Sequence, residues 1–60
     1  MRESDVADYA KRLLAAHGGK AEAEAAAKAR EFEEKNDTDQ AETWRKIRAA
    51  ISEMRGAPLS

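Results

Sequence analysis

The sequence predicts an all-α fold, a small three-helix bundle whose successive helices run up, down and up. Apolar side chains recur at steps of three and four residues, which is the spacing of one helix face. Alanine, glutamate, lysine and arginine are strong helix formers and make up most of the chain. Two breaks, Gly18-Gly19 and Asn36-Asp37, are too short for a crossover connection. Neighbouring helices are therefore expected to fold back antiparallel.

The first helix is predicted over residues 5–17. Ser4 is a preferred N-cap residue, and the acidic residues that follow it are stabilised by the positive end of the helix dipole. Gly18 can adopt the left-handed conformation that commonly ends a helix. The positions at helical spacing are Val6, Tyr9, Ala10, Leu13, Leu14 and His17.

The second helix is predicted over residues 20–35, which are rich in alanine and charged residues. Asn36 can end this helix because asparagine tolerates the left-handed conformation. The inward face is expected to consist of Ala21, Ala25, Ala29 and Phe32. Such a face permits close approach of another helix but contains only one large apolar side chain.

The third helix is predicted over residues 38–55 and carries the heaviest apolar side chains. Asp37 or Thr38 can cap its first turn, and Gly56 is expected to end it. Its apolar stripe consists of Trp44, Ile47, Ile51 and Met54. In the bundle this stripe is expected to pack on Val6, Leu13, Leu14 and Phe32.

Residues 25–51 resemble one tetratricopeptide-type helix hairpin. The resemblance rests on a small residue, an aromatic residue, a tight turn, an alanine and a second aromatic residue, in the order Ala29, Phe32, Asn36-Asp37, Ala41 and Trp44. The sequence departs from that pattern at three positions, which are Ala25 in place of an aromatic residue, Asn36 in place of the turn glycine and Arg48 in place of a small residue. The resemblance implies a hairpin of a family that binds other proteins.

The chain is expected to form one domain, 1–60, with residues 1–3 and 56–60 frayed. Chains of this size usually need disulfides, a metal ion or oligomerisation in addition to their core. The absence of cysteine excludes disulfides, and the single His17 excludes the usual zinc sites. Oligomerisation, a partner or very regular helix packing therefore remains as the additional source of stability.

These observations predict a small helical protein–protein interaction module. It would self-associate as a homodimer, or dock on a larger partner by burying the apolar stripe of its third helix in a groove. The interface candidates lie on the third helix and are Trp44, Ile47, Ile51, Met54, Arg45, Arg48 and Arg55. Trp44 also suits the centre of the protomer core, and both roles are compatible in an obligate dimer.

The arginines Arg45, Arg48 and Arg55 form a cationic stripe beside the apolar one. We expect them to pair with carboxylates of the second helix or of a second copy, the candidates being Glu22, Glu24, Glu31 and Glu34. An acidic protein partner is one alternative. The other is a nucleic-acid-binding regulator that lays the third helix on phosphates, although the net charge of −1 gives no basic surplus.

No constellation of residues indicates an enzyme, so we expect no catalytic, cofactor-binding or metal-binding site. His17 is interpreted as a cation at a helix C-terminus, where the helix dipole favours it. Glu31, Glu33 and Glu34 are interpreted as a solvated face partly paired with neighbouring cations. The chain contains no apolar run of membrane-spanning length and no apolar core of a signal peptide, so a cytoplasmic location without membrane contact is expected.

Overall fold

The computed structural model describes residues 3–56, and these residues contain helices but no strand. The elements in chain order are α1 (Glu3–His17), the 3-10 turn η1 (Gly18–Lys20), α2 (Ala21–Glu34) and α3 (Thr38–Met54). The predicted all-α class is therefore confirmed, and each helix boundary lies within two residues of its predicted position. The predicted fraying of residues 1–2 and 57–60 concerns positions outside the described residues.

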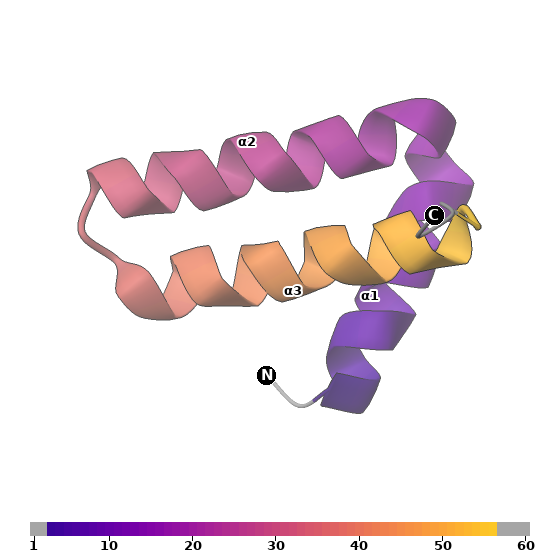
Figure 1. Cartoon of the computed structure of the whole chain (residues 1–60), viewed down its shortest axis with the longest axis horizontal. Coiled ribbons are helices and arrows are strands. Elements are labelled where there is room, and N and C mark those ends of the chain that lie inside the picture. The colour runs from indigo at the N-terminus through magenta and orange to yellow at the C-terminus, as the bar shows by residue number, and fades with distance from the viewer. Residues whose placement is uncertain (1–2, 57–60) are drawn as a thin grey trace.

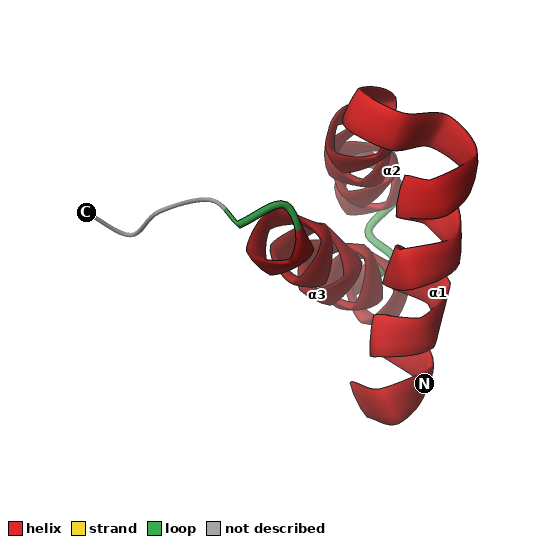
Figure 2. Cartoon of the chain, turned by 90° about the vertical axis from the view of Figure 1, so that its right-hand side faces the viewer, coloured by secondary structure: helices red, strands yellow, loops and turns green. Residues whose placement is uncertain are grey.

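The predicted three-helix, up-down-up bundle is wrong. No non-helical residue separates Glu3 from Glu34, so α1, η1 and α2 form one long helix that bends sharply at η1. The structure consists of this bent helix and α3. Figure 1 shows α2 and α3 side by side and antiparallel, whereas α1 crosses them steeply. The same crossing is visible in Figure 2, in which α2 and α3 are seen nearly end-on and α1 runs across one side of the pair.

The bend arises at Gly18, whose φ of 60° is left-handed as predicted. The following residues return directly to helical geometry, and the Ala21 N–H donates a hydrogen bond to the Gly18 carbonyl. Because the chain continues in helical geometry directly after Gly18, the break redirects the helix and does not reverse it, so the expected hairpin at Gly18-Gly19 is not formed. The first helix also begins at Glu3, so Ser4 lies inside it and is not its N-cap.

The turn between α2 and α3 follows the predicted chemistry. Asn36 has a left-handed φ of 63°. The Asp37 N–H donates to the Phe32 carbonyl at 2.9 Å, and the Asn36 N–H donates to the Glu33 carbonyl at 3.0 Å. This pair of bonds is a Schellman motif, which satisfies the last carbonyls of α2. The Asp37 carboxylate then accepts from the Gln40 N–H at 3.2 Å, so Asp37 caps α3 as predicted.

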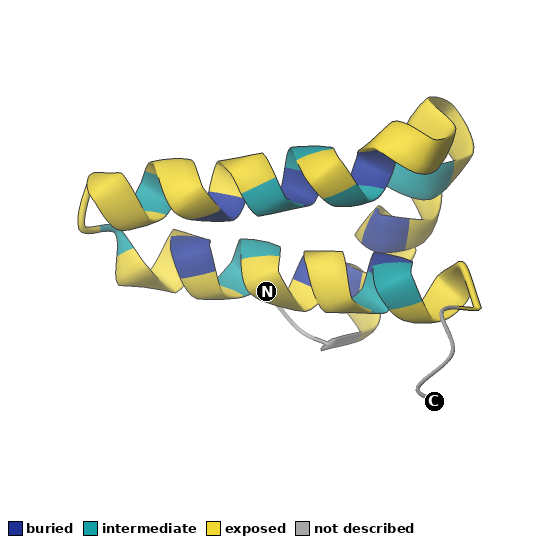
Figure 3. Ribbon diagram, turned by 45° about the horizontal axis from the view of Figure 1, so that its top comes forward, coloured by how far each residue is buried: buried dark blue, intermediate teal, exposed yellow. Residues whose placement is uncertain are grey.

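Among the residues that the structure describes, the buried core contains only aliphatic side chains, and five of the eight buried residues are alanine. Figure 3 shows buried positions on the sides of α2 and α3 that face each other and on α1. The buried residues are Val6, Ala10, Ala21, Ala25, Ala29, Ala41, Ile47 and Ile51. Leu13, Leu14, Trp44 and Ala50 are partly buried and pack against this cluster. A core so rich in alanine lets the helices approach closely but buries little apolar area.

The crossing of α1 explains which side chains of the predicted stripe are buried. Ile47 and Ile51 are 1% and 0% exposed and form the centre of the core, in agreement with the prediction. Met54 is 42% exposed, so its predicted place in the core is wrong. A helix lying along α3 would cover the whole stripe, but a crossing helix covers only its middle. Both ends of the stripe, Trp44 and Met54, are therefore left outside the buried core.

Candidate interaction surfaces

The chain has one tyrosine, one phenylalanine and one tryptophan, and none of the three is fully buried. Tyr9 is 38% exposed, while Phe32 and Trp44 are intermediate. The rings of Tyr9 and Trp44 meet edge to face, with centroids 5.6 Å apart and an interplanar angle of 80°. This contact joins α1 to α3 at the edge of the core, and edge-to-face pairs of this kind add to the attraction from buried area.

An ion pair between α2 and α3 follows both Phe32 and Trp44 directly in the sequence. Glu33 directly follows Phe32 and pairs with Arg45, which directly follows Trp44. Phe32 also lies two helical turns beyond the buried Ala25, on the same face of α2. We refer to Tyr9, Phe32 and Trp44 together as the aromatic surface.

The three members of the aromatic surface differ in their relation to α1, since Tyr9 belongs to α1 and Trp44 contacts it, while Phe32 lies near the end of α2. In Figure 1, α1 crosses the hairpin near η1, and the half that ends at the α2–α3 turn extends beyond it. Phe32 belongs to that half and is not part of the core cluster. The Lys35 Nζ lies over the Phe32 ring, 5.6 Å from the ring centroid. The sequence-based interpretation placed Phe32 on the inward face of the second helix and Tyr9 half-buried at the edge of the core, and it named neither as an interface candidate.

Two of the three arginines of α3 pair with α2. The Arg55 Nη1 donates to the Glu22 Oε1 at 2.9 Å, a partner that the sequence predicted. Arg45 pairs with Glu33, which the sequence-based interpretation assigned to a solvated face. Both pairs are partly exposed to solvent, so each contributes at most about 1 kcal/mol to stability. Arg48 lies between them and forms no ion pair with any residue from 3 to 56.

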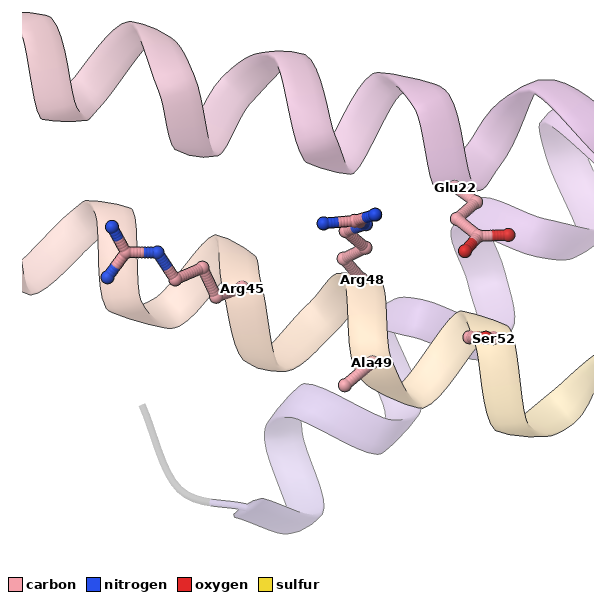
Figure 4. A pocket seen from close by; sticks show the side chains of 5 residues that line it. All are labelled: Glu22, Arg45, Arg48, Ala49 and Ser52. Carbon is pink, nitrogen blue, oxygen red and sulfur yellow. The ribbon is translucent and has the colours of Figure 1, made fainter. Parts of the chain in front are cut away.

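The arginines border a shallow groove between α2 and α3, which we call the arginine groove. It consists of two adjoining depressions of about 230 and 290 Å³. Arg48 and Glu22 border both depressions, and no residue of α1 lines either of them. Figure 4 shows the Arg48 guanidinium directed toward α2, between Arg45 and Glu22. Arg45 lines one depression and Arg55 the other. The remaining lining residues are small, namely Gly19, Ala23, Ala26, Ala49 and Ser52.

The remaining polar candidates form local pairs. The His17 Nδ1 lies 2.7 Å from the Glu24 Oε2, so the contact spans the bend between α1 and α2. Glu31 lies 3.3 Å from Lys35 and 4.0 Å from Lys28 along the same helix. Within residues 3–56, no three His, Asp or Glu side chains are grouped so that they could hold a metal ion. None of the described helices combines the length and the apolar character needed to cross a bilayer.

Comparison with known proteins assigns no family to this chain. No family model, curated protein or solved structure matches it. The α2–α3 hairpin has the antiparallel form and tight turn that the tetratricopeptide resemblance implies. The tetratricopeptide resemblance is limited to residues 25–51 and assigns no function to the chain.

The predicted interface residues are divided between the core and the surface. Ile47 and Ile51 are buried, so they cannot reach a partner while the helices remain packed. Trp44 and Met54 are accessible at the ends of the same stripe. Arg45, Arg48 and Arg55 are exposed beside the arginine groove. The accessible candidates thus divide among the aromatic surface, which contains Trp44, the arginine groove, and Met54, which belongs to neither.

Proposed function

We propose that this protein is a small interaction module that binds an amphipathic helix of a larger protein on its aromatic surface. The observation that supports this function is the placement of the aromatic residues: the core is built from alanine, valine and isoleucine, while Tyr9, Phe32 and Trp44 are all left at its edge. Aromatic side chains bury more apolar area than any others. A short chain that leaves its three aromatic side chains partly exposed loses the free energy that their full burial would contribute. Binding of a partner on these side chains would bury them.

The geometry of the uncovered half of the hairpin favours a helical ligand. In a regular bundle a third helix would lie along both α2 and α3, but α1 crosses them and leaves that position free beyond the crossing. A ligand helix aligned with the hairpin would contact Phe32 from α2 and Trp44 from α3. Tyr9 at the edge of α1 would meet the end of the ligand nearest the crossing.

The area of the aromatic surface limits the strength of the complex. Each ring exposes roughly a third of its surface or less, so the three together offer about 150–250 Å². A stable interface of standard size buries about 800 Å² on each partner. The surface therefore suits a short ligand and a transient complex better than a permanent homodimer. Without a partner, we expect a monomer at micromolar concentration.

Nucleic-acid binding is less well supported than protein binding. Affinity for nucleic acid comes mainly from phosphate contacts made by uncompensated lysine and arginine side chains. Arg45 and Arg55 are each paired with a glutamate, which leaves Arg48 as the only member of the stripe without an ion pair among the described residues. One free arginine on a chain of net charge −1 is a weak electrostatic footprint.

Selection from a library of displayed helical peptides, followed by NMR mapping, tests the proposed function. We expect enriched peptides to be amphipathic and to shift the ring resonances of Tyr9, Phe32 and Trp44. Phe32→Ser should weaken their binding at least about tenfold, because a hot-spot aromatic residue contributes about 2 kcal/mol or more. Met54→Ser is the control, since Met54 is a large apolar side chain that is more exposed than Phe32 and lies at the end of α3 far from the α2–α3 turn.

Two outcomes would contradict the proposed function. One is enrichment of peptides that bind Phe32→Ser and the unchanged protein equally well. The other is a concentration-dependent mass in sedimentation that Tyr9→Ser or Phe32→Ser abolishes, which would assign the aromatic surface to self-association.

A further inference from the structure

The arginine groove carries an inference that is independent of the aromatic surface. We propose that Arg48 binds a single carboxylate of an acidic segment of a partner protein, and that this segment lies along the seam between α2 and α3. The groove is lined by α2, α3 and η1, so α1 does not obstruct it. A protein could therefore occupy it while the aromatic surface is free or bound.

The charge balance of the groove indicates one anionic group. Its border contains Arg45, Arg48 and Arg55 but only one glutamate, Glu22. Glu22 is paired with Arg55, and Arg45 is paired with Glu33 outside the two depressions, so Arg48 is the arginine of the border without an ion pair among the described residues. A guanidinium offers a planar pair of N–H donors that fits one carboxylate bidentately. A polyanion would instead require a row of free cations.

The shape of the groove allows a backbone to come close to Arg48. The walls on either side of it are made of small residues, namely Ala23 and Ala26 on α2 and Ala49 and Ser52 on α3. Small side chains at an interface permit two helices to approach closely, so a partner segment could bring a short Asp or Glu side chain onto the guanidinium. The half-buried Ser52 supplies a hydroxyl beside it that can donate a hydrogen bond to the second carboxylate oxygen.

The flanking ion pairs orient the groove for this ligand. Arg45 and Arg55 are held toward α2 by their glutamates, and both remain more than about a third exposed. An incoming carboxylate therefore meets a positive potential without having to break either pair. Because the site is open to water, its contribution depends on ionic strength.

The test uses the full chain and a blocked, alanine-based helical peptide of about 15 residues with one central glutamate. The comparison peptide has glutamine at that position. The measurement is the chemical shift of the Arg48 Nε–H during titration at low salt. We expect the glutamate peptide to shift this resonance and to bind at least about tenfold more tightly than the glutamine peptide, as for a charge-assisted hydrogen-bonded pair. Sodium acetate and inorganic phosphate serve as small-anion probes and should shift the resonance only at much higher concentration.

Arg48→Ala should abolish the preference for glutamate, while Arg30→Ala, which removes an exposed arginine of α2 outside the groove, should preserve it. Circular dichroism of Arg48→Ala checks that the fold is intact. Equal binding of the two peptides, a preference that survives in Arg48→Ala, or phosphate binding as tight as the glutamate peptide would each overturn the proposal. Failure of the aromatic surface to bind any helix leaves this test unchanged, because its readout and its variants concern another part of the molecule.

Discussion

The bend at η1 can be tested by comparing alanine at two adjacent glycines. Gly18 has a φ of 60°, whereas Gly19 does not lie in the left-handed region. A Cβ added at either position would meet no atom within 4 Å. The two substitutions therefore add the same methyl group to equally open space, and they differ only in the backbone conformation that the new alanine has to adopt.

The magnitude follows from that difference. Both variants reduce the conformational freedom of the unfolded chain, which by itself stabilises the fold by about 0.4–1 kcal/mol. Only Gly18→Ala also places an L-residue in the left-handed conformation, at a cost of roughly 1–2 kcal/mol. We expect Gly19→Ala to be slightly stabilising and Gly18→Ala to be less stable than it by about 1–2 kcal/mol. For a domain of this size each kcal/mol shifts the melting temperature by about 4–8 °C.

Urea and thermal unfolding followed by circular dichroism measure this gap. Tryptophan fluorescence supplies a second readout, because straightening of the bent helix would carry Tyr9 away from Trp44. Equal stability of the two variants, or a more stable Gly18→Ala, would refute the assignment of the bend to a left-handed Gly18. A normal stability gap with an unchanged tryptophan signal would mean that Gly18→Ala tolerates the strain without straightening.

Three further substitutions test the packing and the ends of α3. Ile51→Ala should lower the free energy of unfolding in urea by about 2–5 kcal/mol, a large part of the roughly 3–9 kcal/mol expected for a chain of this length. Met54→Ala should lower it by less than about 1 kcal/mol, because Met54 is 42% exposed. Similar losses for the two variants would contradict the burial pattern. Asp37→Ala should lower the free energy of unfolding by about 1 kcal/mol through loss of the N-cap, while Asp37→Asn should keep both the cap and the stability. Equal losses of stability in the two variants would argue against capping by Asp37. A double-mutant cycle on Arg55→Ala and Glu22→Ala should give a coupling free energy below about 1 kcal/mol that decreases as salt is added, because the pair is partly exposed. A coupling free energy that does not depend on salt would indicate a buried pair.

The sequence predicted the local features of this fold well. Helix boundaries, the left-handed Gly18 and Asn36, and the Asp37 cap all depend on interactions within a few residues, which the residue types largely determine. The direction of α1 depends instead on whether the chain reverses or only bends at Gly18-Gly19, which packing between the helices decides. Gly18-Gly19 is compatible with a hairpin as well as with a bend, and its composition does not distinguish the two.

That one ambiguity also accounts for the errors in the candidate surfaces. The helical spacing correctly placed Ile47, Ile51 and Met54 on one stripe, but the exposure of Met54 follows from the direction of α1 and not from spacing. The Arg55–Glu22 pair was predictable because it needs only an antiparallel hairpin, which the Asn36-Asp37 turn indicated. The incomplete burial of Phe32 was not predictable, because Phe32 was expected on the inward face of a bundle in which α1 lay along α2 and α3.

The alanines between α2 and α3 act as spacers of fixed thickness. Ala25, Ala29 and Ala41 are at most 7% exposed, so no room remains for an additional methylene between the two helices. A bulkier residue at any of them would push α2 away from α3 and stretch the arginine–glutamate pairs that bridge the seam. The alanine side chains thus set the distance between α2 and α3, and with it the width of the arginine groove.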